Sequence, residues 1–545
     1  MKKFNKTLLL LISSLLLVIP VLGDQQSGTR LLETGQTTTV ARRKATAKRR
    51  VSRAKSTRSS NSELRKAYAL LKDRNYEEAS KLLFQLSYNP RYRSQRTQIK
   101  YLLGSALYEL KFDQGAAFNF ISVIKKGRSK YISKSIEKLS LSASRLEDDT
   151  LLNYAIKKIN LNQFPKDQLD LLFFRIGEHQ LRNKLFNDAA KTFGKIRRSS
   201  EYFGEAKYLQ ALSYAEAKSN KQALMAFEDL ISSREGTSIT DSQKVAAQIG
   251  RARVFYQAKK WDEAIEAYRE IPRDTMTWHE TLFESSWAML RSGRFRSALS
   301  NFQSLHSSFY ENYYLPESLL VRSIVYLYIC KYDEMEKILN IFNRIYKPIY
   351  KKIGVYLKER HKPVDVFNEV VAVILSLKKG EKEEDNLGKY SLPYIVLRHL
   401  NRSGDFKRGY RYIKNLLRER RQWEQMSPSW RSSGVGRYVQ RVLKRRLLKA
   451  RTQAGRTLLV NLQGMRTELF GLFEQEAFIR YEMLNGKKEY LKKKVAGKDL
   501  PTAKIDEDNS RDYYIQNGYE YWTFQGEYWL DEIGNYHYVG TQSCE

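Results

Sequence analysis

Residues that could do chemistry are present in this sequence, but their spacing matches no catalytic or metal-binding pattern. The six histidines are scattered, and no two stand at the spacing that places metal ligands on one helix face. The sequence contains no CxxC pair, no phosphate-binding glycine loop and no GxSxG nucleophile elbow. We therefore expect no catalytic residues, no cofactor and no metal, and a protein that is not an enzyme.

One short acidic segment resembles the start of a calcium-binding loop. Asp506, Asp508, Ser510 and Asp512 alternate along the chain, but Arg511 stands where an EF-hand needs glycine. No glutamate closes the loop. A solvated acidic turn is the better interpretation.

The two cysteines allow a disulfide but no disulfide framework. Cys330 lies in an apolar segment and Cys544 lies near the C-terminus. They can pair in an oxidising compartment, although a small buried packing residue is the favoured interpretation of Cys330. The pairing stays open.

Positive charge is concentrated in two stretches of a chain whose formal net charge is +36. Residues 42–58 carry nine basic groups and no acid, and residues 402–451 carry sixteen basic and three acidic groups. Cations of one sign on one surface repel each other unless an anionic partner neutralises them; a solvated helix face is the alternative. The candidate residues for anionic-partner binding are Arg437, Arg441, Lys444, Arg445 and Lys449.

Aromatic side chains crowd the C-terminal tail. Ten of them lie within residues 513–538, and Gln525–Gly526 and Gly534–Asn535 have the composition of tight turns. We expect a small β-hairpin or meander. Its aromatics either pack on neighbouring helices or form an exposed surface for sugar rings or a partner, and the candidates are Trp522, Phe524, Tyr528 and Trp529.

A repeat of small residues predicts the elements that carry these groups. The small residue recurs at steps of 37, 39, 34, 34, 41, 34 and 37, with a second small or medium residue twelve positions earlier and a large residue four positions later. This spacing predicts pairs of antiparallel helices that approach closely at the small residues. The recurring residues are Ala79, Ala116, Ala155, Ala189, Ala223, Ala264, Ala298 and Met335. The residues expected to pack the repeats are Gly177, Ala189, Phe193, Ala211, Ala223, Phe227, Ala252, Ala264, Ala298 and Phe302.

Residues 62–345 resemble about eight tetratricopeptide repeats. The segment WDEAIEAYREIP at 261–272 is similar to a second helix of that family, and Phe173, Ile176 and Gly177 also fall on its motif. The resemblance implies an all-α solenoid that exposes a concave, protein-binding surface. The tail string YWTFQGEYWLDEIG is loosely similar to exported tetratricopeptide proteins of gliding and predatory bacteria.

The remaining segments complete the expected organisation. Lys2, Lys3 and Lys6 followed by an apolar stretch predict a secretory signal peptide, so we expect an exported protein, periplasmic or associated with the outer envelope, whose mature chain has no transmembrane helix. A solenoid also needs an end cap, which we assign to the helices after the repeats. The expected divisions are a signal peptide at 1–23, a disordered basic linker at 24–61, repeats at 62–345, degenerate helical repeats at 346–425, a long basic helical segment at 426–497 and the tail at 498–545.

Together these features favour an exported scaffold that mediates protein–protein interactions in the cell envelope. Its basic regions would dock on anionic protein, lipid or glycan. Two alternatives stay open: a wall- or glycan-binding protein that acts through its aromatic tail, and a nucleic-acid-binding protein, which the charge permits but export disfavours.

Overall fold

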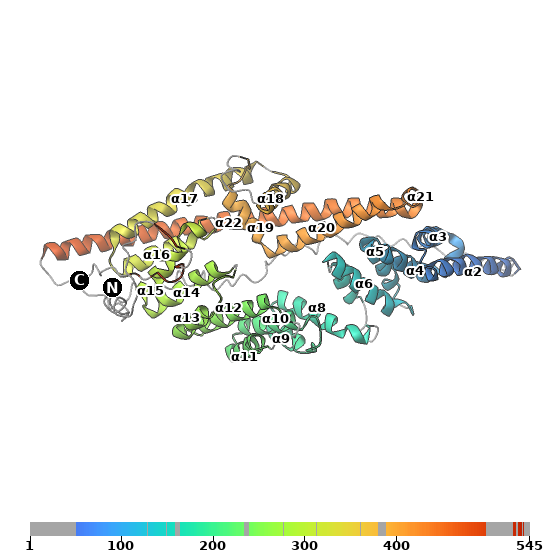
Figure 1. Cartoon of the computed structure of the whole chain (residues 1–545), viewed down its shortest axis with the longest axis horizontal. Helices are drawn as coiled ribbons and strands as arrows, with labels where there is room; N and C mark the ends of the chain where they lie inside the picture. Colours follow the sequence, from blue (N-terminus) through green and yellow to red (C-terminus); the bar gives the residue numbers. More distant parts are fainter. Residues whose placement is uncertain are drawn as a thin grey trace, which may run out of the picture. The chain divides into compact units, whose positions relative to one another are not determined.

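The chain is all-α in the part that the structure describes. The computed structural model describes residues 51–127, 129–148, 150–158, 164–233, 239–275, 277–311, 313–359, 361–379, 389–496, 527–529, 532–536 and 538, with backbone only for 51–61, 493 and 494. Every regular element in these ranges is a helix (Figure 1). The predicted signal peptide lies outside them, as do Asp506–Asp512, Trp522, Phe524 and Cys544.

The helices form two compact units, each built from two separate stretches of sequence. The first unit takes Met1–Gln168 and Arg402–Thr457, and the second takes Leu169–Asn401 and Leu458–Glu545. The first contains α2 (Val51–Lys72), α3 (Tyr76–Tyr88), α4 (Arg96–Glu109), α5 (Asp113–Ile124), α6 (Ile132–Leu146), α7 (Thr150–Ile156), α20 (Gly404–Gln425), α21 (Pro428–Arg431) and the first part of α22 (Gly434–Val495).

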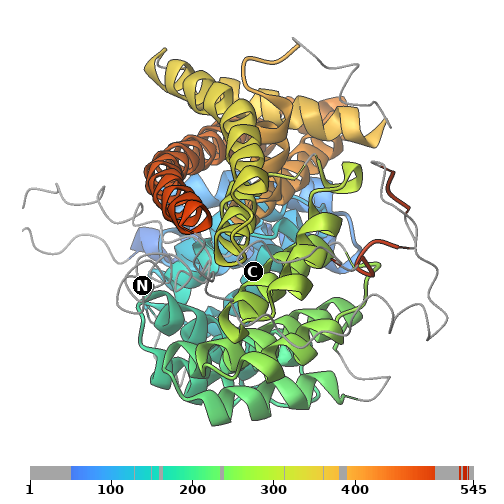
Figure 2. The ribbon, with the colours of Figure 1, turned by 90° about the vertical axis from the view of Figure 1, so that its left-hand side faces the viewer.

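The second unit continues the series of helix pairs, and its α8–α13 appear in green shades in Figures 1 and 2. From α8 to α17 each helix packs against the next one along the chain. Its helices are α8 (Leu169–Arg182), α9 (Phe186–Phe193), α10 (Phe203–Glu216), α11 (Asn220–Ile231), α12 (Asp241–Gln257), α13 (Trp261–Arg269), α14 (Trp278–Ser292), α15 (Phe295–Leu305), α16 (Pro316–Tyr328), α17 (Tyr332–Lys358), α18 (Pro363–Lys378), α19 (Tyr394–Arg402) and the rest of α22.

Eight of the helix pairs share one turn geometry. The first helix ends at a residue with positive φ, such as Lys111 (φ 64°), and the next N–H bonds to the carbonyl five residues back, as Phe112 does to Leu107 at 2.8 Å. This is the Schellman ending of a helix, which reverses the chain in a few residues. In seven of them the turn residue stands five positions before the recurring residue; these turn residues are Arg74, Lys111, Lys184, Lys218, Lys259, Gly293 and Cys330. The eighth is Glu147, between α6 and α7, which stands eight positions before Ala155.

The recurring small residues lie at close helix contacts. All eight residues from Ala79 to Met335 in that series are fully buried, and the ten residues expected to pack the repeats are buried as well. A β-carbon built on Gly177 would lie 2.6 Å from a ring carbon of Phe193, and one on Gly104 would lie 2.7 Å from Phe120. The same sixteen-residue relation therefore brings a helix backbone onto a phenylalanine ring in both units.

Replacing Gly177 by alanine should destabilise the second unit, although alanine is the better helix former. The added methyl has no room beside Phe193, and overpacking of this kind costs about 1–3 kcal/mol. Gly464 is the matched control, because it lies within α22 with no atom within 4 Å of an added β-carbon. Gly464→Ala should raise stability by about 0.5–1 kcal/mol. Denaturant unfolding of both variants checks this, and equal shifts would contradict the close contact.

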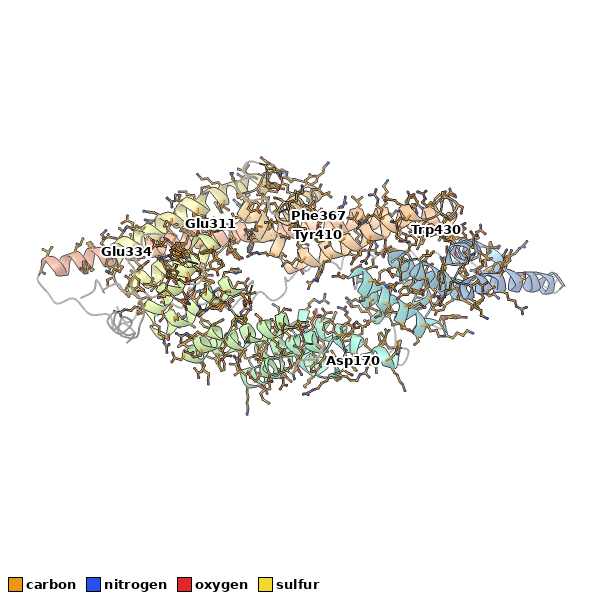
Figure 3. All side chains as sticks on the ribbon, viewed as in Figure 1. Asp170, Glu311, Glu334, Phe367, Tyr410 and Trp430 are labelled. Atoms are coloured by element: carbon orange, nitrogen blue, oxygen red, sulfur yellow. The ribbon has the colours of Figure 1, made fainter. Side chains whose placement is uncertain are left out.

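The helices after residue 345 were expected to extend the array and cap its end, but residues 402–457 belong to the first unit. Residues 402–457 pack on α3, α5 and α6: Trp430 stacks on Phe112 with ring centroids 5.1 Å apart, and the ring of Tyr438 lies 5.6 Å from that of Phe84. Trp430 is labelled in Figure 3. The physical reason is that α3 and α5 offer an apolar surface that α21 and α22 bury, which sequence order cannot reveal.

In the second unit α22 runs antiparallel to α17. Tyr332 meets Gly486, Asn343 meets Glu476 with a 3.0 Å hydrogen bond, and Gly354 lies against Arg466. The buried residues on α22 recur at alternating steps of three and four, which is the spacing of helix pairs that pack along their length. They are Leu462, Met465, Leu469, Leu472, Glu476, Ile479 and Met483.

Two expected boundaries differ from the structure. α2 begins at Val51, so residues 51–61 of the segment expected to be disordered are helical. α17 continues to Lys358, beyond the predicted end of the repeats at 345, and contains Pro348. The antiparallel contact with α22 explains this extension. None of the described helices is long and apolar enough to cross a membrane.

Candidate anion-binding surface

The first part of α22 has one buried face and one charged face. Val435, Val439 and Leu443 are buried, with Val439 against Gly115 of α5. This apolar stripe orients the helix, so that the intervening basic residues face solvent. The five sequence candidates, Arg437, Arg441, Lys444, Arg445 and Lys449, are all exposed.

The segment that carries these five cations contains no acidic residue of its own. Residues 425–467 contain ten basic residues and no acidic one. Among the described residues none of the five forms an ion pair, whereas arginines on α20 do: Arg411 pairs with Glu147 at 2.7 Å and Arg420 with Glu424 at 3.1 Å. The charged face of α22 therefore keeps its full positive charge toward solvent.

The arrangement suits binding to phosphate or carboxylate groups. The five residues fall within thirteen positions of one helix, a length of about 20 Å. Arginine guanidinium groups bind such anions with two parallel hydrogen bonds, and lysine adds point charge. Arg446 is a different case, because its guanidinium lies 4.6 Å from the ring centre of Phe118 and packs on α5.

A second surface in the first unit is a groove beside α2, α4 and α6. Its lining includes Tyr68, Tyr101 and Tyr76 of α3, together with Lys72 and Lys138. Aromatic side chains with a polar tip are common where proteins bind one another. The groove is therefore a candidate contact surface for a protein segment.

The tail residues divide between packing and exposure. The Tyr528 hydroxyl accepts a 3.2 Å hydrogen bond from Gln303 on α15, and the Gly534 N–H bonds to Ser304 Oγ at 2.8 Å. Trp529 is 61% exposed. Glu532 to Asn535 form a turn at one of the two predicted positions, but the described tail residues contain no strand. With Trp522 and Phe524 outside the described residues, an aromatic surface and the hairpin stay predictions.

Cys330 occupies the positive-φ position of the α16–α17 turn (φ 57°), where the other pairs have a basic residue, a glycine or Glu147. It is half-buried and disulfide-bonded. The interpretation as a simple packing residue is therefore incomplete. Cys544, the one other cysteine of the sequence, lies outside the described residues.

Sequence reasoning missed a buried carboxyl pair at the start of α5. Glu419 of α20 accepts a 3.0 Å hydrogen bond from the Gln114 N–H, beside Asp113, and both carboxyls are only 4% exposed. Arg145 lies 3.4 Å from Asp113. Burial raises the pKa of Asp113 to about 6, and burial together with the nearby Asp113 raises the pKa of Glu419 well above its usual value. The two residues are 306 positions apart in the sequence, so no local pattern could have joined them.

No protein-family model matches this chain, and no match is found among curated proteins.

Proposed function

We propose that this chain is an exported tetratricopeptide-type scaffold of the cell envelope, which holds protein partners and docks on an anionic partner through α22. The 34-residue spacing, the shared turn geometry and the glycine–phenylalanine contacts support a repeat architecture. The basic N-terminal residues followed by an apolar stretch support export. In this proposal the tyrosine-lined groove of the first unit contacts a protein segment.

The main support for docking on an anionic partner is the positive charge on α22 that forms no ion pair with the described residues. Five exposed cations, within 43 residues that contain no acid, repel each other unless an anion binds. A structural role for these side chains does not account for this, because none of them forms an ion pair with a described residue. An anionic protein, glycolipid or glycan of the envelope would remove that repulsion.

The test compares a variant that loses three positive charges on α22 with a variant that loses three positive charges elsewhere. Arg437→Gln/Arg441→Gln/Arg445→Gln should elute from a polyanion resin at clearly lower salt than the wild-type chain, and its affinity should fall by about tenfold or more. Lys191→Gln/Arg198→Gln/Lys221→Gln changes three exposed cations of the second unit and leaves the net charge equal to that of the first variant.

The control variant should keep nearly wild-type elution and the same distribution among envelope fractions. If both variants shift equally, binding depends on net charge alone and the proposed docking face is wrong. A salt-dependent gel shift with duplex DNA, together with cytoplasmic location of the tagged protein, would favour the nucleic-acid alternative instead.

The exposed indole of Trp529 favours one second candidate, binding to cell-wall glycan. A flat aromatic side chain that is 61% exposed can stack on a sugar ring. Sedimentation with purified cell wall distinguishes glycan binding by the tail from docking through α22. Loss of sedimentation in a chain that lacks residues 498–545, with no effect of the α22 variant, would support glycan binding.

A further inference from the structure

The far end of α22 displays an apolar row on a face other than the one that contacts α17. Leu484, Leu491 and Val495 are 57%, 49% and 88% exposed, and Tyr481 one turn earlier is 59% exposed. Their steps of three, seven and four place them on one face of the helix. Met483, Gly486 and Tyr490 occupy the other face, where Gly486 and Tyr490 contact Tyr332.

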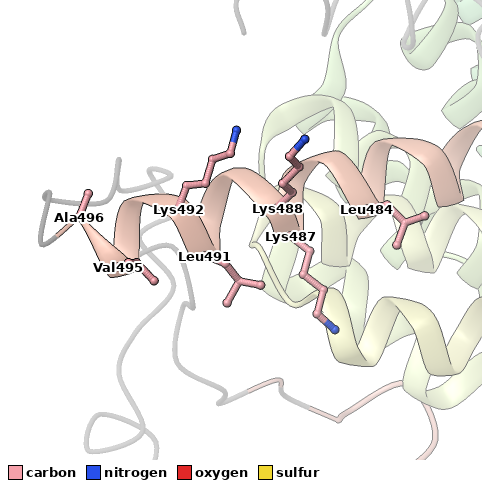
Figure 4. A pocket seen from close by; sticks show the side chains of 7 residues that line it. All are labelled: Leu484, Lys487, Lys488, Leu491, Lys492, Val495 and Ala496. Carbon is pink, nitrogen blue, oxygen red and sulfur yellow. The ribbon is translucent and has the colours of Figure 1, made fainter.

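Lysines flank and interrupt this apolar row. Figure 4 shows the side chains of Lys488 and Lys492 extending to one side of it, and Lys487 turning the other way, where it pairs with Asp333 at 2.8 Å. Residues 481–496 contain five lysines and two glutamates, a net charge of +3. The end of α22 is thus a basic amphipathic helix with its apolar side uncovered.

We propose that this end of α22 binds the surface of an anionic lipid bilayer. Leu484, Leu491 and Val495 would enter the boundary between headgroups and acyl chains, and Lys488 and Lys492 would contact lipid phosphates. The proposal rests on the export of the chain, which is part of the proposed function, but it uses a different surface from the basic face at 437–449.

The position of Lys488 favours a lipid surface over a partner helix. It stands between Leu484 and Leu491 in the sequence, and its side chain extends from the edge of the apolar row, as does that of Lys492 (Figure 4). A partner helix that covered the row would bring both ammonium groups against its own surface, which is unfavourable unless it carries matching carboxylates. At a bilayer surface the same side chains bend toward the phosphates while their methylene groups stay with the apolar row.

Flotation with vesicles tests the proposal on the full-length mature chain. We expect binding to vesicles rich in phosphatidylglycerol and much weaker binding to pure phosphatidylcholine. Leu484→Ser/Leu491→Ser/Val495→Ser should weaken vesicle binding by about tenfold or more. Leu448→Ser/Val460→Ser is the matched control, since both residues are exposed and apolar on the same helix, 63% and 47% respectively. It should bind like the wild type.

Two further variants distinguish the contribution of the lysines to vesicle binding from that of the basic face at 437–449. Lys488→Gln/Lys492→Gln should lower binding to anionic vesicles and reduce its dependence on salt. The Arg437/Arg441/Arg445 variant should retain binding that depends on the apolar row, so failure of the docking face and failure of this proposal give different results.

Two results would overturn the lipid proposal. One is a wild-type chain that does not float with anionic vesicles, or an apolar-row variant that floats equally well. The other is a concentration-dependent dimer in the absence of lipid that the apolar-row variant abolishes, because the row would then be covered by a second copy.

Discussion

Replacing Trp430 by alanine should lower the free energy of unfolding of the first unit by about 3–5 kcal/mol, the usual cost of emptying a buried tryptophan site. The Trp430 and Phe112 side chains are both fully buried, and their rings stack at an interplanar angle of 9°. The indole N–H also donates a 2.8 Å hydrogen bond to Ser80 Oγ. Alanine would remove the ring, the stacking and the hydrogen bond together.

The effect should be measured locally as well as globally. A chain with two units need not unfold in a single step, so hydrogen exchange of the α3 and α5 amides gives the clearest readout. Faster exchange there, with little change in α10 to α13, would place the loss in the first unit. Trp430→Phe should cost less, because it keeps an aromatic ring against Phe112 and loses the hydrogen bond.

Trp529→Ala is the matched control, because Trp529 is largely exposed and its removal should change stability by less than about 0.5 kcal/mol. If Trp430→Ala behaved like Trp529→Ala, residues 402–457 would not contribute to the core of the first unit. The contrast tests the least expected feature of the fold, the packing of residues 402–457 against helices that precede them by 273 to 350 residues at two of the contacts.

The part of the fold that sequence could predict depends on short-range spacing. Ala189, Ala223 and Phe193 stand at fixed offsets within about 34 residues, and the same offsets recur along the chain. This regular spacing is sufficient to predict the close helix contacts. The basic residues Arg437 and Arg441 were likewise readable as one exposed face, because Val439 and Leu443 mark the buried side at helical spacing.

The part that sequence could not predict depends on long-range contacts. Nothing near Trp430 indicates Phe112 as its neighbour, and nothing near Glu419 indicates the N-terminus of α5. The division of α22 between two units was equally hidden, because its apolar positions continue through Thr457 and Leu458 without a break in helical spacing. The periodicity of a sequence predicts contacts between neighbouring helix pairs. The packing of a segment that lies far away in the sequence depends instead on the complementarity of two surfaces, which periodicity does not contain.

The carboxyl pair at α5 predicts an unusual pH dependence of stability for the first unit. In the unfolded chain both carboxyls titrate near pH 4. In the folded chain the pKa of Asp113 is about 6 and that of Glu419 is raised well above its usual value. Between these values the folded state holds more protons than the unfolded state, so the free energy of unfolding falls as pH rises.

The magnitude should be readily measurable. For Asp113 alone the raised pKa corresponds to about 3 kcal/mol of stability that is fully present only below pH 4, falls as the pH rises through 6, and is lost by pH 8. The neighbouring cations Arg145, Arg418 and Lys111 offset part of the cost of burial but do not reverse it. Burial outweighs both these cations and the favourable position at a helix N-terminus.

Glu419→Gln should therefore stabilise the first unit at pH 8 and have little effect at pH 4. The glutamine oxygen can still accept the hydrogen bond from the Gln114 N–H, while the buried negative charge is gone. Glu424→Gln on the same helix is the control, because Glu424 is exposed and its replacement should change stability by less than about 0.5 kcal/mol at either pH.

Urea unfolding at the two pH values, followed by amide exchange of α5, gives the required difference between variants. Because Asp113 remains ionisable, Glu419→Gln should flatten the pH profile without abolishing it, and addition of Asp113→Asn should flatten it further. A Glu419→Gln variant that is destabilised at pH 8 would mean that the carboxylate is favourable where it lies, and that the cations and backbone N–H groups around it outweigh its burial.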